Sequence, residues 1–222
     1  MQSNREKITK YVEKGVVDES SPMDPPDAFC PPATVDVRPE DMAPYLQKLI
    51  AEHRDFSAAI EAFESILGSI AEKGVTSAAN DGLREFFHKF DTAFMEHHKR
   101  EERCLFPVLQ RRLVEEGEHS RGDKTVTGVD VMVDEHLRAI QLAAVAFNLF
   151  GLSGRLPDAG SRLVALDAAI EQGKSLVELL RLHIFREDHI IFPLAHQHID
   201  AERLEDMEGA DDAGEPGAGE RS

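Results

Sequence analysis

Two stretches of the sequence repeat one polar pattern: HHKREERCLFP at residues 97–107 and HIFREDHIIFP at residues 183–193. Each stretch holds a histidine followed four residues later by a glutamate, and each ends in Phe-Pro. The pairs are His97 with Glu101, and His183 with Glu187. Residues four apart lie one above the other on a helix, so each pair presents an imidazole and a carboxylate side by side. Both groups are metal ligands, and their repetition indicates a site that draws on two helices.

Four long segments with apolar residues three and four apart surround these pairs. They cover about residues 39–73, 78–116, 125–150 and 159–199. This spacing predicts amphipathic helices, and the short glycine-containing connections between them are typical of helix hairpins. Because such helices bury their apolar faces only against one another, we expect an all-α fold, an antiparallel up-down-up-down four-helix bundle.

The ends of the chain differ from this central region in composition. Residues 1–38 are rich in proline and predict an extended N-terminal arm, while residues 200–222 are rich in acids, glycine and alanine and predict a flexible, disordered tail. The four predicted helices lie between these ends and form one bundle, residues 39–199.

The apolar stripes contain polar residues at the same level in all four predicted helices. The stripe of the second helix includes His97 and Glu101, and that of the fourth includes His183 and Glu187. His53 and His136 occupy the stripes of the first and third helices. In an antiparallel hairpin, residues at equal height have their sequence midpoint in the connecting turn. The pairs His53–His97 and Glu101–His136 meet this condition, and the midpoint of His136–His183 falls at the end of the third connection. The six side chains are therefore predicted to converge in one slab of the core.

Six buried polar groups require compensation, because each unsatisfied one costs about 1–3 kcal/mol. Four imidazoles and two carboxylates suit a pair of iron or manganese ions, with the glutamates bridging and the histidines divided between the metals. A single zinc ion needs four ligands and leaves two groups unexplained. Because these six side chains share their carboxylates between two ions, they also leave coordination positions on the ions open for a small ligand such as O2, NO or peroxide. A structural bundle with a buried polar layer is the alternative without a metal.

Residues beside the six candidates are assigned simpler roles. His98, Glu102 and Asp188 lie about 100° round the helix from their neighbours, so solvated positions or pairing between helices are favoured over hydrogen bonds to the site. Pro107 and Pro193 are expected to kink or end the two helices just past the ligands.

The four elements EH at 52–53, HHKREERCLFP at 97, EH at 135–136 and HIFREDHIIFP at 183 resemble the hemerythrin superfamily. The similarity spans roughly residues 40–198 and is strongest to bacterial hemerythrin-like domains with the His-His-Glu cation-binding signature. It implies a four-helix bundle that holds two iron ions, with manganese or zinc as substitutes. The ligands it implies are His53, His97, Glu101, His136, His183 and Glu187.

The sequence also departs from the oxygen-carrying members of that superfamily. They have a second histidine one turn after the third-helix ligand, where this chain has Ile140, and an aspartate that would align with Asp188 rather than Glu187. The missing histidine argues against simple reversible O2 transport. Four histidines with two glutamates are similar to di-iron proteins described as repairing iron centres damaged by nitric oxide or peroxide. Those proteins commonly carry paired cysteines in an N-terminal extension, where this chain has only Cys30.

The sequence therefore predicts a non-haem di-iron protein that binds or reacts with O2, NO or peroxide in redox or nitrosative stress or in iron-centre repair. An O2 or iron sensor or carrier that signals to a partner without catalysis is the alternative. Catalytic groups beyond the metal ligands are not expected. The electron donor and the oligomeric state are left open by the sequence.

Composition limits the partners and the location. The 222 residues carry 42 acids and 25 bases, a formal net charge of −17, which opposes binding to the phosphate backbone of nucleic acids. No apolar run long enough for a transmembrane helix and no secretory h-region are found in the sequence, so we expect a cytoplasmic protein without a membrane partner.

Overall fold

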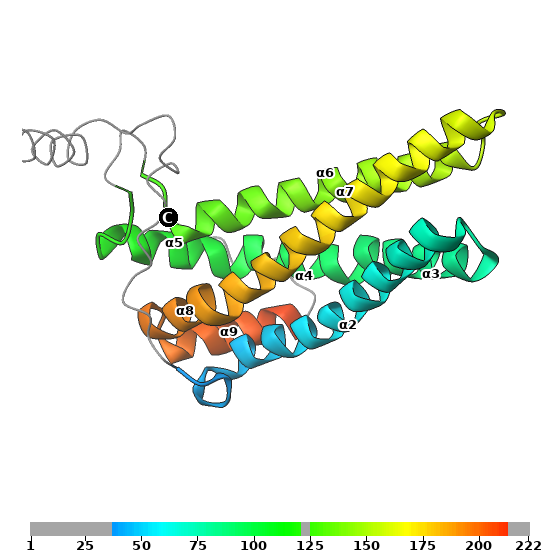
Figure 1. Cartoon of the computed structure of the whole chain (residues 1–222). Helices are drawn as coiled ribbons and strands as arrows, with labels where there is room; N and C mark the ends of the chain where they lie inside the picture. Colours follow the sequence, from blue (N-terminus) through cyan, green and yellow to red (C-terminus); the bar gives the residue numbers. More distant parts are fainter. Residues whose placement is uncertain (1–36, 121–124, 213–222) are drawn as a thin grey trace, which may run out of the picture.

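The computed structural model describes residues 37–120 and 125–212, and within these residues all regular structure is helical. A short 3-10 turn, Pro39–Asp41, precedes α2 (Pro44–Lys73). The second helical segment comprises α3 (Ser77–Lys89), α4 (Met95–Arg100) and α5 (Phe106–Glu115), with π-helical turns between them. It is followed by α6 (Gly128–Ser153), α7 (Ala159–Arg186), α8 (Phe192–His198) and α9 (Ala201–Asp212). The predicted all-helical class is confirmed, and the helices pack as a bundle in which α7 lies along α6 and α2 (Figure 1).

Local sequence signals set the ends of these helices. The side chain of Thr76 accepts a hydrogen bond from the amide of Ala79 at the start of α3. Asp158 accepts one from the amide of Ser161 at the start of α7, and Thr127 forms a capping box with Asp130 in α6. Gly74 ends α2 with φ +74°, a conformation that glycine adopts without steric cost.

Each of the two repeated stretches contains a π-helical turn, Glu101–Leu105 and Glu187–Ile191. The amides of Phe106 and Phe192 donate to the carbonyls of Glu101 and Glu187, five residues back. The prolines that follow occupy the first turn of the next α-helical segment, where their missing N–H is tolerated. Of the two expected effects of these prolines, a kink or the end of the helix, the second is therefore wrong. The π-helical turns accommodate the prolines, so both helices continue.

The apolar core falls into two clusters along the bundle. One contains Leu49, Leu105 and Phe192, and the other contains Phe63 and Phe86. Every long segment crosses from one cluster to the other, and the polar residues lie at the crossing. The change occurs between Ile50 and Phe56, between Phe94 and Cys104, between Met132 and Ala139, and between Leu180 and Ile191. The core is thus interrupted by one polar slab, as the sequence predicts.

The C-terminal segment corrects one prediction. Residues 201–212 form α9, which packs against α2 (Figure 1). Its Leu204 and Met207 are buried with Tyr45 and Leu46 of α2 in the first apolar cluster. The prediction of disorder from acids, glycine and alanine is wrong here, because two apolar residues three apart suffice to dock a short helix. Residues 1–36 of the predicted arm, with Cys30, and the tail beyond residue 212 lie outside the described residues.

No described helix combines the length and the apolarity that crossing a bilayer requires.

The contact between α2 and α7 depends on a glycine. A Cβ atom at Gly173 would lie 2.9 Å from both Cδ atoms of buried Leu67 and 3.3 Å from Phe63. We predict that Gly173→Ala lowers the free energy of unfolding by about 1–3 kcal/mol through overpacking. Gly68→Ala is the matched control, since it is exposed on α2 with no neighbour within 4 Å, and it should raise stability by up to about 1 kcal/mol. Denaturant titration measures both, and equal effects would contradict this account of the packing.

Candidate metal centre

The structure brings together all six residues that the sequence analysis grouped. His53, His97, Glu101 and Glu187 each offer one ligand atom, and these atoms lie within 4.8 Å of one another. A second such set consists of Glu101, Glu187, His136 and His183. The two glutamates belong to both sets, and all six residues are buried. The arrangement has two halves that share two carboxylates, as expected for two ions with bridging ligands.

In each half, two imidazoles direct their Nε2 atoms at the same place. The Nε2 atoms of His53 and His97 are 2.9 Å apart, and those of His136 and His183 are 3.1 Å apart. Two nitrogen ligands at right angles, each about 2.1 Å from an ion, are about 3.0 Å apart. The spacing of each imidazole pair therefore fits two ligands of one metal ion.

The carboxylates of Glu101 and Glu187 carry the strongest indication of a cation. Both side chains are 0 % exposed, and none of their four oxygens has a hydrogen-bond partner. These oxygens lie 3.2–3.8 Å from imidazole Nε2 atoms, outside hydrogen-bond geometry. A buried carboxylate without hydrogen bonds is strongly unfavourable unless a cation is present. The donor set fits metal ions between these oxygens and the imidazoles.

A second layer of carboxylates holds the outer nitrogens of the four imidazoles. The Nδ1 contacts are His53 with Asp188 at 2.7 Å, His97 with Glu52 at 2.6 Å, His136 with Glu102 at 2.7 Å and His183 with Glu135 at 3.2 Å. A carboxylate that accepts from Nδ1 fixes the tautomer and leaves the Nε2 lone pair toward the centre. Arg100 pairs with Glu52 and Arg186 pairs with Glu135, which holds those two carboxylates in turn.

These outer contacts decide between two predicted positions and add two residues. Solvated positions or pairing between helices were predicted for Glu102 and Asp188; both residues pair between helices, and they do so through hydrogen bonds to site histidines, which were not favoured. Glu52 and Glu135 were not identified as functional residues. The sequence feature that could have identified them is their position: each directly precedes a site histidine, in the two Glu-His elements.

His98 is buried against another helix, so the solvated one of its two predicted positions is wrong. The side chain is 4 % exposed and stacks on the ring of His136, with 3.7 Å between centroids and 11° between planes. Burial, together with the neighbouring His136 and His183, lowers the pKa of His98 well below its usual value, so the ring is neutral. Ile140, by contrast, is 37 % exposed and belongs to neither apolar cluster.

Protons occupy the site when no cation balances the carboxylates. Burial lowers the pKa of His53, but its hydrogen bond to Asp188 and the charge of Glu187 outweigh burial and raise the pKa to about 9. Burial likewise opposes protonation of His97, and Glu101 and Glu52 raise its pKa to about 10. For Glu187, burial raises the pKa, but His183 and the other imidazoles outweigh it and hold the pKa well below its usual range. The metal-free site is thus an ion-paired cluster of imidazolium and carboxylate.

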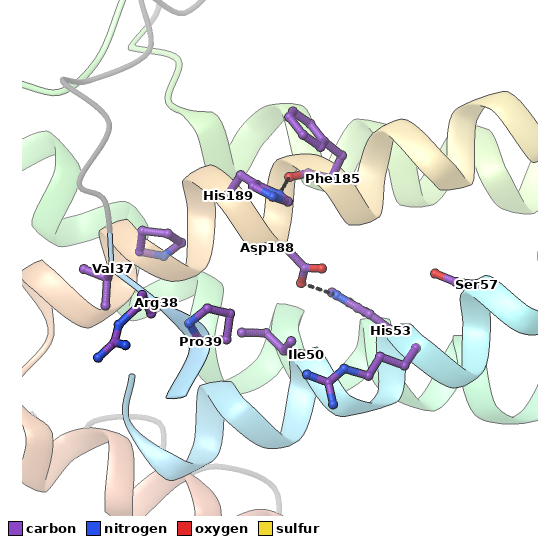
Figure 2. A pocket seen from close by; sticks show the side chains of 11 residues that line it. Val37, Arg38, Pro39, Ile50, His53, Ser57, Phe185, Asp188 and His189 are labelled. Atoms are coloured by element: carbon purple, nitrogen blue, oxygen red, sulfur yellow. Dashed lines mark hydrogen bonds and ion pairs between the residues drawn. The ribbon is translucent and has the colours of Figure 1, made fainter. Parts of the chain in front are cut away.

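One side of the site approaches the surface at His53. A pocket of about 780 Å³ lies between α2 and the α7–α8 segment and is lined by Ser57, Phe185 and His189 among others. Figure 2 shows these side chains. At its floor, Asp188 accepts the hydrogen bond from the Nδ1 atom of His53. Asp188 is 21 % exposed, whereas His53 is buried. The pocket therefore reaches the outer carboxylate layer rather than the Nε2 atoms.

With this geometry established, comparison with family models gives one match, the hemerythrin HHE cation-binding domain, over residues 45–195. The chain belongs to this family. The matched range contains the six clustered residues and the four outer carboxylates. A comparison with curated proteins found no match, and a comparison with solved structures also found none. Membership in the hemerythrin family makes the chain a metal-binding protein of a type that holds iron. The buried carboxylates of Glu101 and Glu187, which have no hydrogen bonds, agree with this.

The raised imidazole pKa values predict that metal binding releases protons. The Nε2 atoms of His53 and His97 face each other, so this pair keeps at least one proton at pH 7, which an ion must displace. Because the folded pKa values lie above pH 7, metal affinity should rise with pH, by about tenfold per unit for each proton released, and level off above about pH 10. Calorimetric titration of the metal-free protein in buffers of different ionisation enthalpy measures the released protons. Binding without proton release would contradict this electrostatic description.

Proposed function

We propose that the chain is a non-haem di-iron protein that reacts with a small oxidant, O2, NO or peroxide, on an up-down-up-down four-helix bundle. The observation that carries the proposal is the set of four buried carboxylate oxygens of Glu101 and Glu187, without hydrogen bonds, between two imidazole pairs. Two divalent ions would supply the charge that these groups lack. Manganese and zinc are substitutes that the same donors accept.

In the proposed centre, His53 and His97 hold one ion, His136 and His183 hold the other, and Glu101 and Glu187 bridge them. Bound iron would supply one-electron chemistry and coordination positions for the oxidant. The protein itself holds the imidazole and carboxylate donor atoms in position. The four outer carboxylates orient the imidazoles and increase their basicity, which strengthens their binding to the metal.

Aromatic rings exclude water around the proposed centre. Phe192 stacks on His53 at 5.5 Å between centroids, and Phe106 stacks on His136 at 5.7 Å. The edge contact of Phe56 with His97 is 5.2 Å. All three phenylalanines are buried. An apolar wall of this kind admits an uncharged diatomic molecule more readily than it admits ions, and it prevents bulk water from competing for the metals.

Substitution of the shared carboxylates tests the metal assignment. We predict that Glu101→Ala and Glu187→Ala reduce iron content after anaerobic reconstitution far below that of the wild type, because each removes a ligand shared by both ions. Glu102→Ala and Asp188→Ala should weaken iron binding by about 10- to 100-fold, since they act through an imidazole.

The control for this series is Glu96→Ala, an exposed acid that pairs with Lys99 on the same helix and should leave iron content unchanged. Metal analysis gives iron per chain, and circular dichroism verifies folding. Near-zero iron in the wild type after reconstitution would refute the di-iron proposal. A larger loss in the Asp188 and Glu102 variants than in the Glu187 and Glu101 variants would refute the ligand assignment.

Stopped-flow absorbance of the ferrous protein with O2, NO and peroxide tests reactivity. We expect at least one of the three to oxidise the centre in a rapid phase, followed by repeated turnover when a reductant is supplied. Stable binding without consumption would instead identify a carrier or sensor. Absence of any spectral change with all three would exclude the oxidant chemistry proposed here.

A further inference from the structure

A second pocket lies between α3 and the hairpin of α6 and α7, at the end of the bundle opposite α8 and α9 (Figure 1). Its volume is about 830 Å³, within the range of about 300–1,000 Å³ that is typical of small-molecule sites. Two of its residues, Phe87 and Phe147, are ten and eleven positions from the site histidines His97 and His136. At a rise of 1.5 Å per residue this is about 15 Å along the helical segments. The pocket is therefore separate from the proposed metal centre.

Apolar side chains form most of the wall of this pocket. Phe87 is buried, and its ring meets that of Phe147 edge-on with 5.2 Å between centroids. Phe147 is nevertheless 56 % exposed, and Leu163 on α7, which lines the same pocket, is 61 % exposed. Large apolar side chains that stay exposed together around a pocket are typical of a surface that a ligand or a partner covers. The wall thus offers a place for an apolar group.

Three arginines line the same pocket. They are Arg84 on α3, Arg155 after the end of α6 and Arg162 on α7, and all three are exposed. Arg84 and Arg162 form no salt bridge with any residue that the structure describes, and Arg155 donates from Nε to a backbone carbonyl. Asp158, the acid whose charge interacts with Arg162, caps the start of α7. The guanidinium groups are therefore available to an anion.

The charge at this pocket is opposite to that of the whole protein. Among the described residues, no acidic side chain lines the pocket, although the chain carries 42 acids and 25 bases. A guanidinium group binds a carboxylate through two parallel hydrogen bonds. A ligand that complements both the apolar wall and the arginines has an apolar body and a carboxylate.

We propose that this pocket binds a long-chain fatty acid. The acyl chain lies against Phe87, Phe147 and Leu163, and the carboxylate binds the exposed arginines. A ligand in this place connects α3 to the α6–α7 hairpin and covers the exposed apolar side chains. The inference goes beyond the proposed di-iron function and does not depend on it, because none of the six proposed metal ligands lines the pocket.

The net charge of the chain favours a single small anion over the larger occupants of such a surface. A formal charge of −17 repels a second copy of the chain, and it also repels an anionic lipid surface. A single carboxylate inside the pocket has the three arginines as its nearest charged groups on the pocket wall. The charge complementarity is therefore local to the pocket.

Calorimetric titration of the full chain with dodecanoate, below its micellar concentration, tests the proposal. We expect one saturable site per chain, with the same affinity in iron-loaded and iron-free protein. Dodecanol has the same chain length without the charge and should bind about 10-fold more weakly. Acetate, a carboxylate without the chain, should show no measurable binding.

Variants separate the charged part of the pocket from the apolar part. Arg84→Gln combined with Arg162→Gln should weaken dodecanoate binding by about 10-fold and leave dodecanol binding unchanged. Phe147→Ser should weaken the binding of both ligands by about 10-fold, because it removes apolar surface. These three residues are exposed, and circular dichroism verifies that the variants fold. Arg138→Gln is the control, since Arg138 is an exposed arginine on α6 that does not line the pocket.

Several outcomes would overturn the inference. Absence of saturable dodecanoate binding would do so, and so would equal affinities for dodecanoate and dodecanol or an equal loss in Arg138→Gln. Dimerisation in light scattering that Phe147→Ser abolishes, without dodecanoate binding, would assign the pocket to a second copy of the chain. Sedimentation with phosphatidylserine vesicles, without binding of free dodecanoate, would assign it to a membrane surface. Iron content is not a readout of these measurements, so the di-iron function is tested separately.

Discussion

The structure depends on the burial of two carboxylates in the middle of the bundle. Glu101 and Glu187 are fully enclosed, without hydrogen bonds, between two apolar clusters. Such a core is tolerated only if positive charge is placed against the four oxygens. In the metal-free chain this charge comes from imidazoles whose pKa values are raised, and in the proposed holoprotein it comes from two ions. The imidazoles, their outer carboxylates and the enclosing aromatic rings all serve this one requirement.

The site consists of two halves built by the same rule. In one, His53 contacts Asp188 and His97 contacts Glu52; in the other, His136 contacts Glu102 and His183 contacts Glu135. Each acid that follows a shared glutamate supports a histidine on a different helix, so the outer contacts join the helices as well as orient the ligands. The halves differ at His98, which lies on one side only.

The predictable part of the site was the convergence of its ligands. Helical periodicity placed His97 with Glu101 and His183 with Glu187 on inner faces, and the hairpin turns set them level with the remaining histidines. For side chains one position away, the pattern left solvent and a neighbouring helix both open, because 100° of rotation does not distinguish them. Glu102, Asp188 and His98 all lie in that sector. The π turns after the two glutamates, which carry both helices past Pro107 and Pro193, are likewise not visible in an ideal 3.6-residue pattern.

The sequence by itself determined the helical class, the level of the polar slab and the six residues in it, because these follow from periodicity and turn positions. Only the tertiary structure decided which carboxylate supports which imidazole, since the partners are separated by 34–135 positions and come from different helices. It also decided that α9 docks on α2 and that His98 is buried. These outcomes depend on side-chain packing between helices, which the pattern along one chain does not contain.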